Sequence, residues 1–260
     1  MCLIAFAWQC HPRFPLVLAA NRDEFHSRPT EAVHRWSAPA GLVAGRDLEA
    51  GGTWLGAGPG GRIAALTNVR EPASGRSAAP PSRGELPVAF LADSRSPAAF
   101  VHDLADTAAT YRGFNLLLVT GDALLLTSNR GTGPVAPGPG IHAVSNAPPG
   151  VDWPKTRRAR QILGHGLADN GDTLEGLIEA AFALLADPAP ADDRELPETG
   201  LTAARERLLS AIFVIGSNYG TRCSTVLVVD REGTLHWHER RFGPDARPAG
   251  SSRLQLAYGR

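Results

Sequence analysis

The sequence has few cysteines, no net charge and no long apolar run. Three cysteines occur in 260 residues, at positions 2, 10 and 223, without a C-x-x-C pair or a histidine cluster at metal-ligand spacing. This pattern favours a reduced, cytoplasmic setting and predicts no metal site. Lysine plus arginine equals aspartate plus glutamate, at 26 each, so no positive excess indicates nucleic-acid binding. No apolar segment approaches the roughly eighteen residues of a membrane span, and none is predicted.

Two short apolar runs open the chain, residues 3–8 and 16–20, with a proline-containing segment between them. Runs of this length and spacing predict two adjacent strands of a buried hairpin. A hairpin brings its open ends together, so Cys2 is expected beside the polar run from Asn21 to Glu24. The first run is too short for an export signal, and no lysine or arginine precedes it.

The position of Cys2 suggests a nucleophile. If Met1 is removed, Cys2 carries a thiol with a reference pKa of about 8.5 and a free α-amine with a reference pKa of about 7.7 to 8.0. The amine can then act as general base for the thiol of its own residue. The charge of Arg22 is expected to lower the pKa of the thiol. The alternative is that Cys2 is a small apolar residue in a strand, as most free cysteines are.

The rest of the chain shows strand patterns, then helices, then strands again. Apolar runs between turn signals predict strands at residues 42–46, 53–57, 62–68, 114–120, 123–128, 141–145, 211–216, 223–230 and 235–242. Capping residues and helical periodicity predict helices near residues 83–93, from 96 onward, and over 154–168, 172–186 and 205–209. Residues 25–40 and 71–81 are expected to be irregular, and 243–260 a loosely ordered tail. This order favours antiparallel sheets covered by helices. The length of 260 residues allows either two small domains or one large layered domain.

A set of short motifs then resembles a known family. In chain order the motifs are Asn21-Arg22-Asp23-Glu24, Thr67-Asn68-Val69-Arg70, Ser82-Arg83-Gly84, Gly113-Phe114-Asn115-Leu116, Ser128-Asn129-Arg130, Ser145-Asn146-Ala147 with Trp153-Pro154-Lys155, and Tyr219-Gly220-Thr221-Arg222. Together they resemble the NRDE family, also called the Transport and Golgi organisation 2 family. That family is similar to the N-terminal nucleophile hydrolases of the bile-salt hydrolase and penicillin acylase type.

The resemblance implies a fold and a set of catalytic residues. The fold is a four-layer αββα sandwich of two antiparallel sheets. Cys2 matches the nucleophile, Asp23 the aspartate that holds the N-terminal amine, Asn146 the oxyanion asparagine and Arg222 the late active-site arginine. One departure is Ala20, where the hydrolases have an arginine; Arg22 is the alternative source of that charge.

Two classes of function follow from the resemblance. The first is an N-terminal cysteine hydrolase or acyltransferase that acts on C–N or thioester bonds, with Asn21, Arg22, Glu24 and Asn68 as substrate-binding residues. The second is a non-catalytic protein that binds haem or acyl-coenzyme A for trafficking. A catalyst needs the free amine of Cys2, and a carrier does not. The expected partners are a small-molecule amide, an acyl thioester or haem, with no cofactor required.

Overall fold

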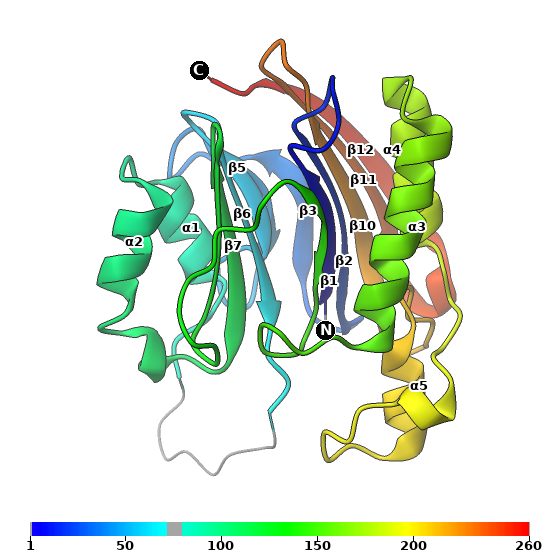
Figure 1. Cartoon of the computed structure of the whole chain (residues 1–260). Helices are drawn as coiled ribbons and strands as arrows, with labels where there is room; N and C mark the ends of the chain where they lie inside the picture. Colours follow the sequence, from blue (N-terminus) through cyan, green and yellow to red (C-terminus); the bar gives the residue numbers. More distant parts are fainter. Residues whose placement is uncertain (1, 72–79, 260) are drawn as a thin grey trace. The chain divides into compact units, whose positions relative to one another are not determined.

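The computed structural model describes residues 2–71 and 80–259. These residues form two six-stranded antiparallel sheets and five α-helices, which confirms the predicted α+β class. They group into two compact units, each with one sheet and with helices against one face of that sheet (Figure 1). Each unit is built from several separate segments of the chain, and the single domain over residues 1–242 that the resemblance implies stays a prediction.

The first unit contains both ends of the N-terminal hairpin. It consists of the chain up to Ser27, Gly138–Ser145 and Val151–Leu256. Its strands, in spatial order, are β12 (Pro248–Ala257), β11 (Thr234–Phe242), β10 (Tyr219–Val229), β2 (Leu16–Phe25), β1 (Cys2–Trp8) and β9 (Gly140–Val144). Its helices are α3 (Pro154–Asn170), α4 (Leu174–Leu185) and α5 (Ala203–Ser210), with short 3₁₀ turns η2 (Asp193–Glu195) and η3 (Pro244–Ala246).

Helices α3 and α4 lie side by side against the central strands of this sheet (Figure 1). Alternate residues of β1, including Leu3, Ala5 and Ala7, pack with α3 and α4 in one apolar core. All seven residues of β1 are buried. Burial on both faces explains why the sequence shows an unbroken apolar run here instead of the alternation of a half-buried strand.

The second unit is a meander with two helices inserted. It consists of Arg28–Pro137, Asn146–Gly150 and Ala257–Arg260. Its strands follow chain order: β3 (Thr30–Arg35), β4 (Val43–Asp47), β5 (Leu55–Gly58), β6 (Arg62–Asn68), β7 (Phe114–Thr120) and β8 (Ala123–Ser128). Helices α1 (Glu85–Leu91) and α2 (Pro97–Leu104), followed by the turn η1 (Ala108–Thr110), separate β6 from β7. The apolar faces of α1 and α2 pack on this sheet.

Three sequence expectations differ from the structure. The C-terminal tail is a sixth strand, β12, rather than a loosely ordered segment. Residues 25–40 contain β3, which is largely solvent-accessible and so lacks an apolar pattern. Residues 211–214 are buried and Ile215 is exposed, and the segment 211–216 forms no strand. Most of the loop expected over residues 71–81 lies outside the described residues.

Candidate active site

The hairpin register places Cys2 opposite Arg22. Strands β1 and β2 pair from Cys2↔Arg22 to Trp8↔Leu16, which confirms the predicted hairpin. On the other side of β2, Arg22 pairs with Cys223 of β10. Residues directly opposite one another in an antiparallel sheet share a face, so the thiol of Cys2, the guanidinium of Arg22 and the thiol of Cys223 start from one row on one face.

The neighbouring residues of β2 point to the opposite face. Asn21 is fully buried, and its Nδ2 donates to the main-chain oxygens of Leu185 and Ile212, both at 2.8 Å. Its Oδ1 accepts from the hydroxyl of Ser224 at 2.6 Å. Leu185 is the last residue of α4, where carbonyl groups lack partners within the helix. The side chain of Asn21, expected to bind substrate, thus holds the end of α4 against the sheet.

Asp23 lies on the same face as Asn21 and is buried as well. Its Oδ1 accepts from the hydroxyl of Thr221 at 2.7 Å, and that hydroxyl accepts from the main-chain N–H of Val214 at 2.9 Å. Burial raises the pKa of the Asp23 carboxyl, while the charge of Lys155, the Thr221 hydrogen bond and the charge of Arg22 act in the opposite direction. The site therefore holds a carboxyl group whose ionisation depends on its neighbours.

The thiol of Cys2 differs from the expectation based on Arg22. Burial raises the pKa of this thiol, and the charge of Asp23 raises it further. Arg22 and the main-chain N–H of Asp23 both lower it, but the net direction is upward. The prediction that Arg22 lowers the pKa of the Cys2 thiol is therefore wrong in net effect. Removing the thiolate from water destabilises it by more than the nearby Arg22 charge stabilises it.

Arg22, Glu24 and Arg222 gather at the same end of the sheet. Arg22 Nη2 and Glu24 Oε2 are 3.9 Å apart, and Arg222 Nη1 donates to the Phe25 oxygen at 2.8 Å. Burial lowers the pKa of Arg222, and the charge of Arg22 lowers it further. Arg222 stands where the β2–β10 register shifts between Thr221 and Cys223. The structure thus brings Cys2, Asp23 and Arg222 to one end of the first unit.

The other two cysteines have different environments. Cys10 is exposed, whereas Cys223 is buried. Burial raises the pKa of the Cys223 thiol strongly, and the charge of Glu239 adds to this effect. Reagents that attack accessible thiols will therefore reach Cys10 first.

Asn68 and Asn146 belong to the second unit. The structure brings these two residues together: Asn146 Nδ2 donates to the Asn68 oxygen at 2.8 Å, and the Asn146 oxygen accepts from the main-chain N–H of Arg70 at 2.7 Å. The oxyanion role of Asn146 and the substrate-binding role of Asn68 stay predictions.

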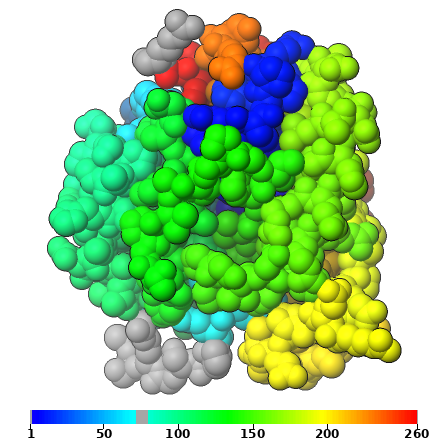
Figure 2. Space-filling view, in the orientation of Figure 1, coloured from blue at the N-terminus to red at the C-terminus, as the bar shows by residue number. Residues whose placement is uncertain are grey.

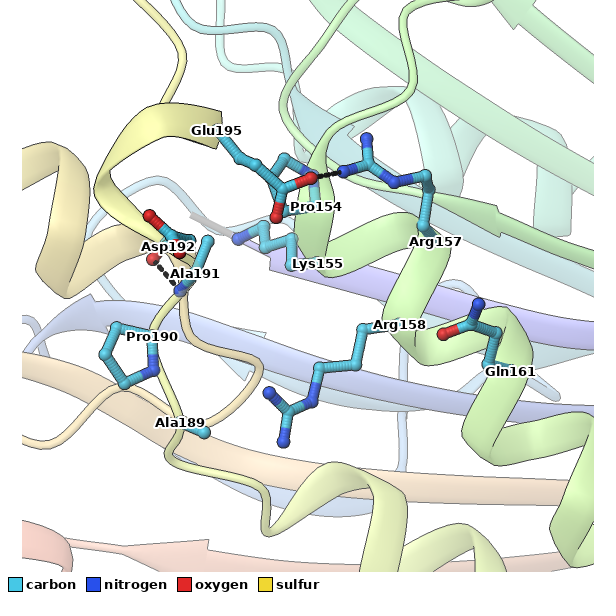
Figure 3. Close-up of a pocket in the computed structure, with 11 residues that line it drawn as sticks. Pro154, Lys155, Arg157, Arg158, Gln161, Ala189, Pro190, Ala191, Asp192 and Glu195 are labelled. Atoms are coloured by element: carbon cyan, nitrogen blue, oxygen red, sulfur yellow. Dashed lines mark hydrogen bonds and ion pairs between the residues drawn. The ribbon is translucent and has the colours of Figure 1, made fainter.

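Lys155 belongs to the motif Trp153-Pro154-Lys155, but the sequence predicts no role for it. Lys155 is 3% exposed, and its Nζ donates to the Leu209 oxygen at 3.2 Å. It also lines a pocket of about 450 Å³ between the start of α3 and the segment 189–195 (Figure 3). Its burial could have been predicted from the sequence, because Lys155 lies four and eight residues before Ala159 and Leu163 and so shares their buried face of α3.

The described part of the chain contains no group of three or more histidine, cysteine, aspartate or glutamate side chains arranged to hold a metal ion. Across residues 2–71 and 80–259, no helix combines the length and apolar character that crossing a membrane requires.

Comparisons with known proteins extend over nearly the whole chain. The family model for Transport and Golgi organisation 2 matches residues 1–244. The Transport and Golgi organization protein 2 homolog of Bos taurus is 32% identical over 262 residues, with 92% of both chains covered. The Homo sapiens homolog is 30% identical over 260 residues, with the same coverage. Among solved structures, the C2A mutant of the conjugated bile acid hydrolase from Clostridium perfringens has a TM-score of 0.50 at 7% identity, covering 98% of this chain and 92% of that chain. This last likeness concerns the fold.

Proposed function

This chain belongs to the Transport and Golgi organisation 2 family, and from that premise we propose that it is a Cys2-dependent acyl hydrolase or acyltransferase of the N-terminal nucleophile type. Its substrate is a small molecule with an amide or thioester bond. The observation that carries the proposal is the convergence of Cys2, Asp23 and Arg222 at one end of the sheet. The fold likeness to a bile acid hydrolase, solved with its own second residue changed from cysteine to alanine, supports the same reaction class.

The buried thiol makes a base necessary. A thiol with a raised pKa supplies little thiolate at neutral pH, and the thiolate is the nucleophile. In the proposed reaction the α-amine of Cys2, free after removal of Met1, takes the thiol proton. Asp23 holds the resulting ammonium group in place. Met1 itself lies outside the described residues.

The chemistry has two steps. The sulfur of Cys2 attacks the carbonyl carbon, a C–S bond forms, and the C–N or C–S bond of the substrate breaks. The leaving amine or thiol takes the proton from the α-amine. Water, or an acceptor nucleophile, then attacks the acyl-thioester, which releases the acyl group and restores the thiol. The proposal gives Asn146 the hydrogen bond to the oxyanion, so Asn146→Ala should reduce turnover by about 10²- to 10³-fold.

The test is covalent trapping in a background that lacks the exposed thiol. Cys10→Ser protein is incubated with a long-chain acyl thioester, and its intact mass is measured. We expect an acyl adduct on a chain that has lost Met1, no adduct after the further change Cys2→Ala, and an unchanged adduct after Cys223→Ala. Cys223 is the matched control because it is also a buried thiol in the same row of the sheet.

The Cys10→Ser protein, with and without Cys2→Ala, also distinguishes an enzyme from a non-catalytic binding protein. A carrier of haem or acyl thioester would bind its ligand with equal affinity in the Cys10→Ser protein with and without Cys2→Ala, and would form no adduct. Binding without an adduct or turnover, or an adduct that persists after Cys2→Ala, would overturn the proposed enzyme function.

A further inference from the structure

Lys155 occupies a position that an apolar residue would normally fill. Residues Lys155, Ala159 and Leu163 form one stripe of α3 and are 3%, 0% and 2% exposed. Ala159 and Leu163 pack in the core with Leu3 of β1. Lys155 comes one helical turn earlier, on the same side of α3. Lysine is almost never buried to this degree unless its charge has a partner.

The surroundings of Lys155 connect it to Asp23. Its Nζ donates to the oxygen of Leu209, at 3.2 Å. The segment that starts at Leu209 makes three hydrogen bonds to the sheet. The oxygen of Ile212 accepts from Asn21, the N–H of Val214 donates to the Thr221 hydroxyl, and the oxygen of Val214 accepts from the N–H of Thr221. Lys155 is therefore tied to the same short segment that lies beside Asn21 and the Thr221 partner of Asp23.

The groups that stabilise the Asp23 carboxylate include side chains of three elements. Lys155 of α3 and Arg22 of its own strand β2 favour the carboxylate, and Thr221 of β10 adds a hydrogen bond. The titratable thiol of Cys2 on β1 is influenced by the Asp23 charge in turn.

We propose that Lys155 is a positioning residue, a buried cation that keeps Asp23 ionised and directed toward the Cys2 end of β1. This inference rests on the proposed function, in which Asp23 must be a carboxylate to hold the α-amine of Cys2. Lys155 does not contact the reacting atoms itself. It acts through Asp23, and its positive charge offsets the cost of burying the Asp23 carboxylate.

The first experiment measures Asp23 directly in the resting protein. Carboxyl ¹³C resonances of aspartate are followed against pH, and the Asp23 signal is assigned by its loss in Asp23→Asn. We expect Lys155→Met, which keeps a long side chain without charge, to move the Asp23 titration to higher pH. Lys155→Arg keeps the charge and should leave it unchanged. Arg158→Met is the matched control on α3, because Arg158 is part-exposed and pairs with Asp187.

A second measurement covers the case in which Lys155→Met folds poorly. If the two buried charges compensate each other, Asp23→Asn should raise the unfolding temperature more in the Lys155→Met protein than it does in the wild type. If Lys155 serves only as a tether for Leu209, Asp23→Asn will change the unfolding temperature equally with and without Lys155→Met, and the Asp23 titration of Lys155→Met will match the wild type. Either of these tether results overturns the inference.

Failure of the inference is distinguishable from failure of the proposed function. The titration and the unfolding temperatures need no substrate, so they report on Lys155 even if no acyl transfer occurs. Conversely, an acyl adduct on Cys2 together with an unshifted Asp23 titration in Lys155→Met would leave the enzyme function standing and remove the role of Lys155.

Discussion

Replacing Asn21 with alanine removes three buried hydrogen bonds at once. The two Nδ2 bonds to Leu185 and Ile212 and the Oδ1 bond from Ser224 are lost. Each buried group left without its partner costs about 1 kcal/mol or more, so the expected loss of stability is about 3 kcal/mol. For a chain of this length, 1 kcal/mol lowers the unfolding temperature by about 2–4 °C. Asn21→Ala should therefore lower it by about 6–12 °C.

The comparison with Ser224→Ala makes this prediction sharp. Ser224→Ala removes one of the same three bonds, so its expected loss is about 1 kcal/mol and about 2–4 °C. Asn21→Asp keeps the size of the side chain but turns an acceptor oxygen toward the carbonyls of Leu185 and Ile212, so it should unfold at or below the temperature of Asn21→Ala. Thermal unfolding of the three variants at neutral pH, followed by circular dichroism, is the assay.

Two results would refute the structural role of Asn21. One is an Asn21→Ala protein that unfolds within the range of Ser224→Ala. The other is an Asn21→Ala protein with the unfolding temperature of the wild type and a raised KM for an acyl donor. That result would support the substrate-binding role that the sequence predicts for Asn21.

Three further perturbations test other parts of the structure. A Cβ on Gly52 would lie 2.4 Å from the main-chain carbon of Gly84, whereas one on Gly138 would meet nothing within 4 Å; Gly52→Ala should cost about 1–3 kcal/mol by overpacking, and Gly138→Ala should have little effect on thermal unfolding. Burial raises the pKa of Asp23 above its ordinary value of 3.8, so the folded state holds this proton more tightly, and stability should fall as pH rises from the ordinary pKa through the folded one. The unfolding temperature of Asp23→Asn minus that of the wild type should therefore increase as pH rises through that range. A difference that stays constant with pH would contradict the raised pKa of Asp23. Thr221→Val removes the hydroxyl that Asp23 accepts from and should move the Asp23 titration to higher pH in the same carboxyl NMR measurement.

The strands with long buried runs were predictable, whereas two edge strands, β3 and β12, were not. Strands β1, β2, β6 and β7 have at least six consecutive buried residues each, and the apolar runs within them stand out in the sequence. Strand β12, at the edge of its sheet, has no buried residue. Without a buried face there is no periodicity to detect, so an ordered strand had the composition of a loose tail.

The segment 211–216 shows the opposite error. Ala211, Ile212, Phe213 and Val214 are all buried, as an interior strand would be. However, the N–H of Phe213 donates to the oxygen of Asp187, and the N–H of Val214 donates to the hydroxyl of Thr221. An apolar run predicts burial, but partners distant in the sequence decide whether its main chain joins a ladder.

The run Asn21 to Glu24 combines what the sequence could and could not predict. The predicted hairpin correctly put this run beside Cys2, but the sequence alone suggested that all four polar residues serve one site. As members of β2 they alternate between faces: Asn21 and Asp23 meet α4, Thr221 and the charge of Lys155, whereas Arg22 lies in the row of Cys2 and forms its ion pair with Glu24. The residues that the sequence grouped therefore divide into an internal anchor with a buried carboxyl group on one face and a pair of opposite charges on the other. In the proposed reaction Cys2 needs residues from both faces of β2. Asp23 lies on the face opposite Arg22, yet its charge still raises the pKa of the Cys2 thiol, so the ionisation of Asp23 affects the nucleophile directly.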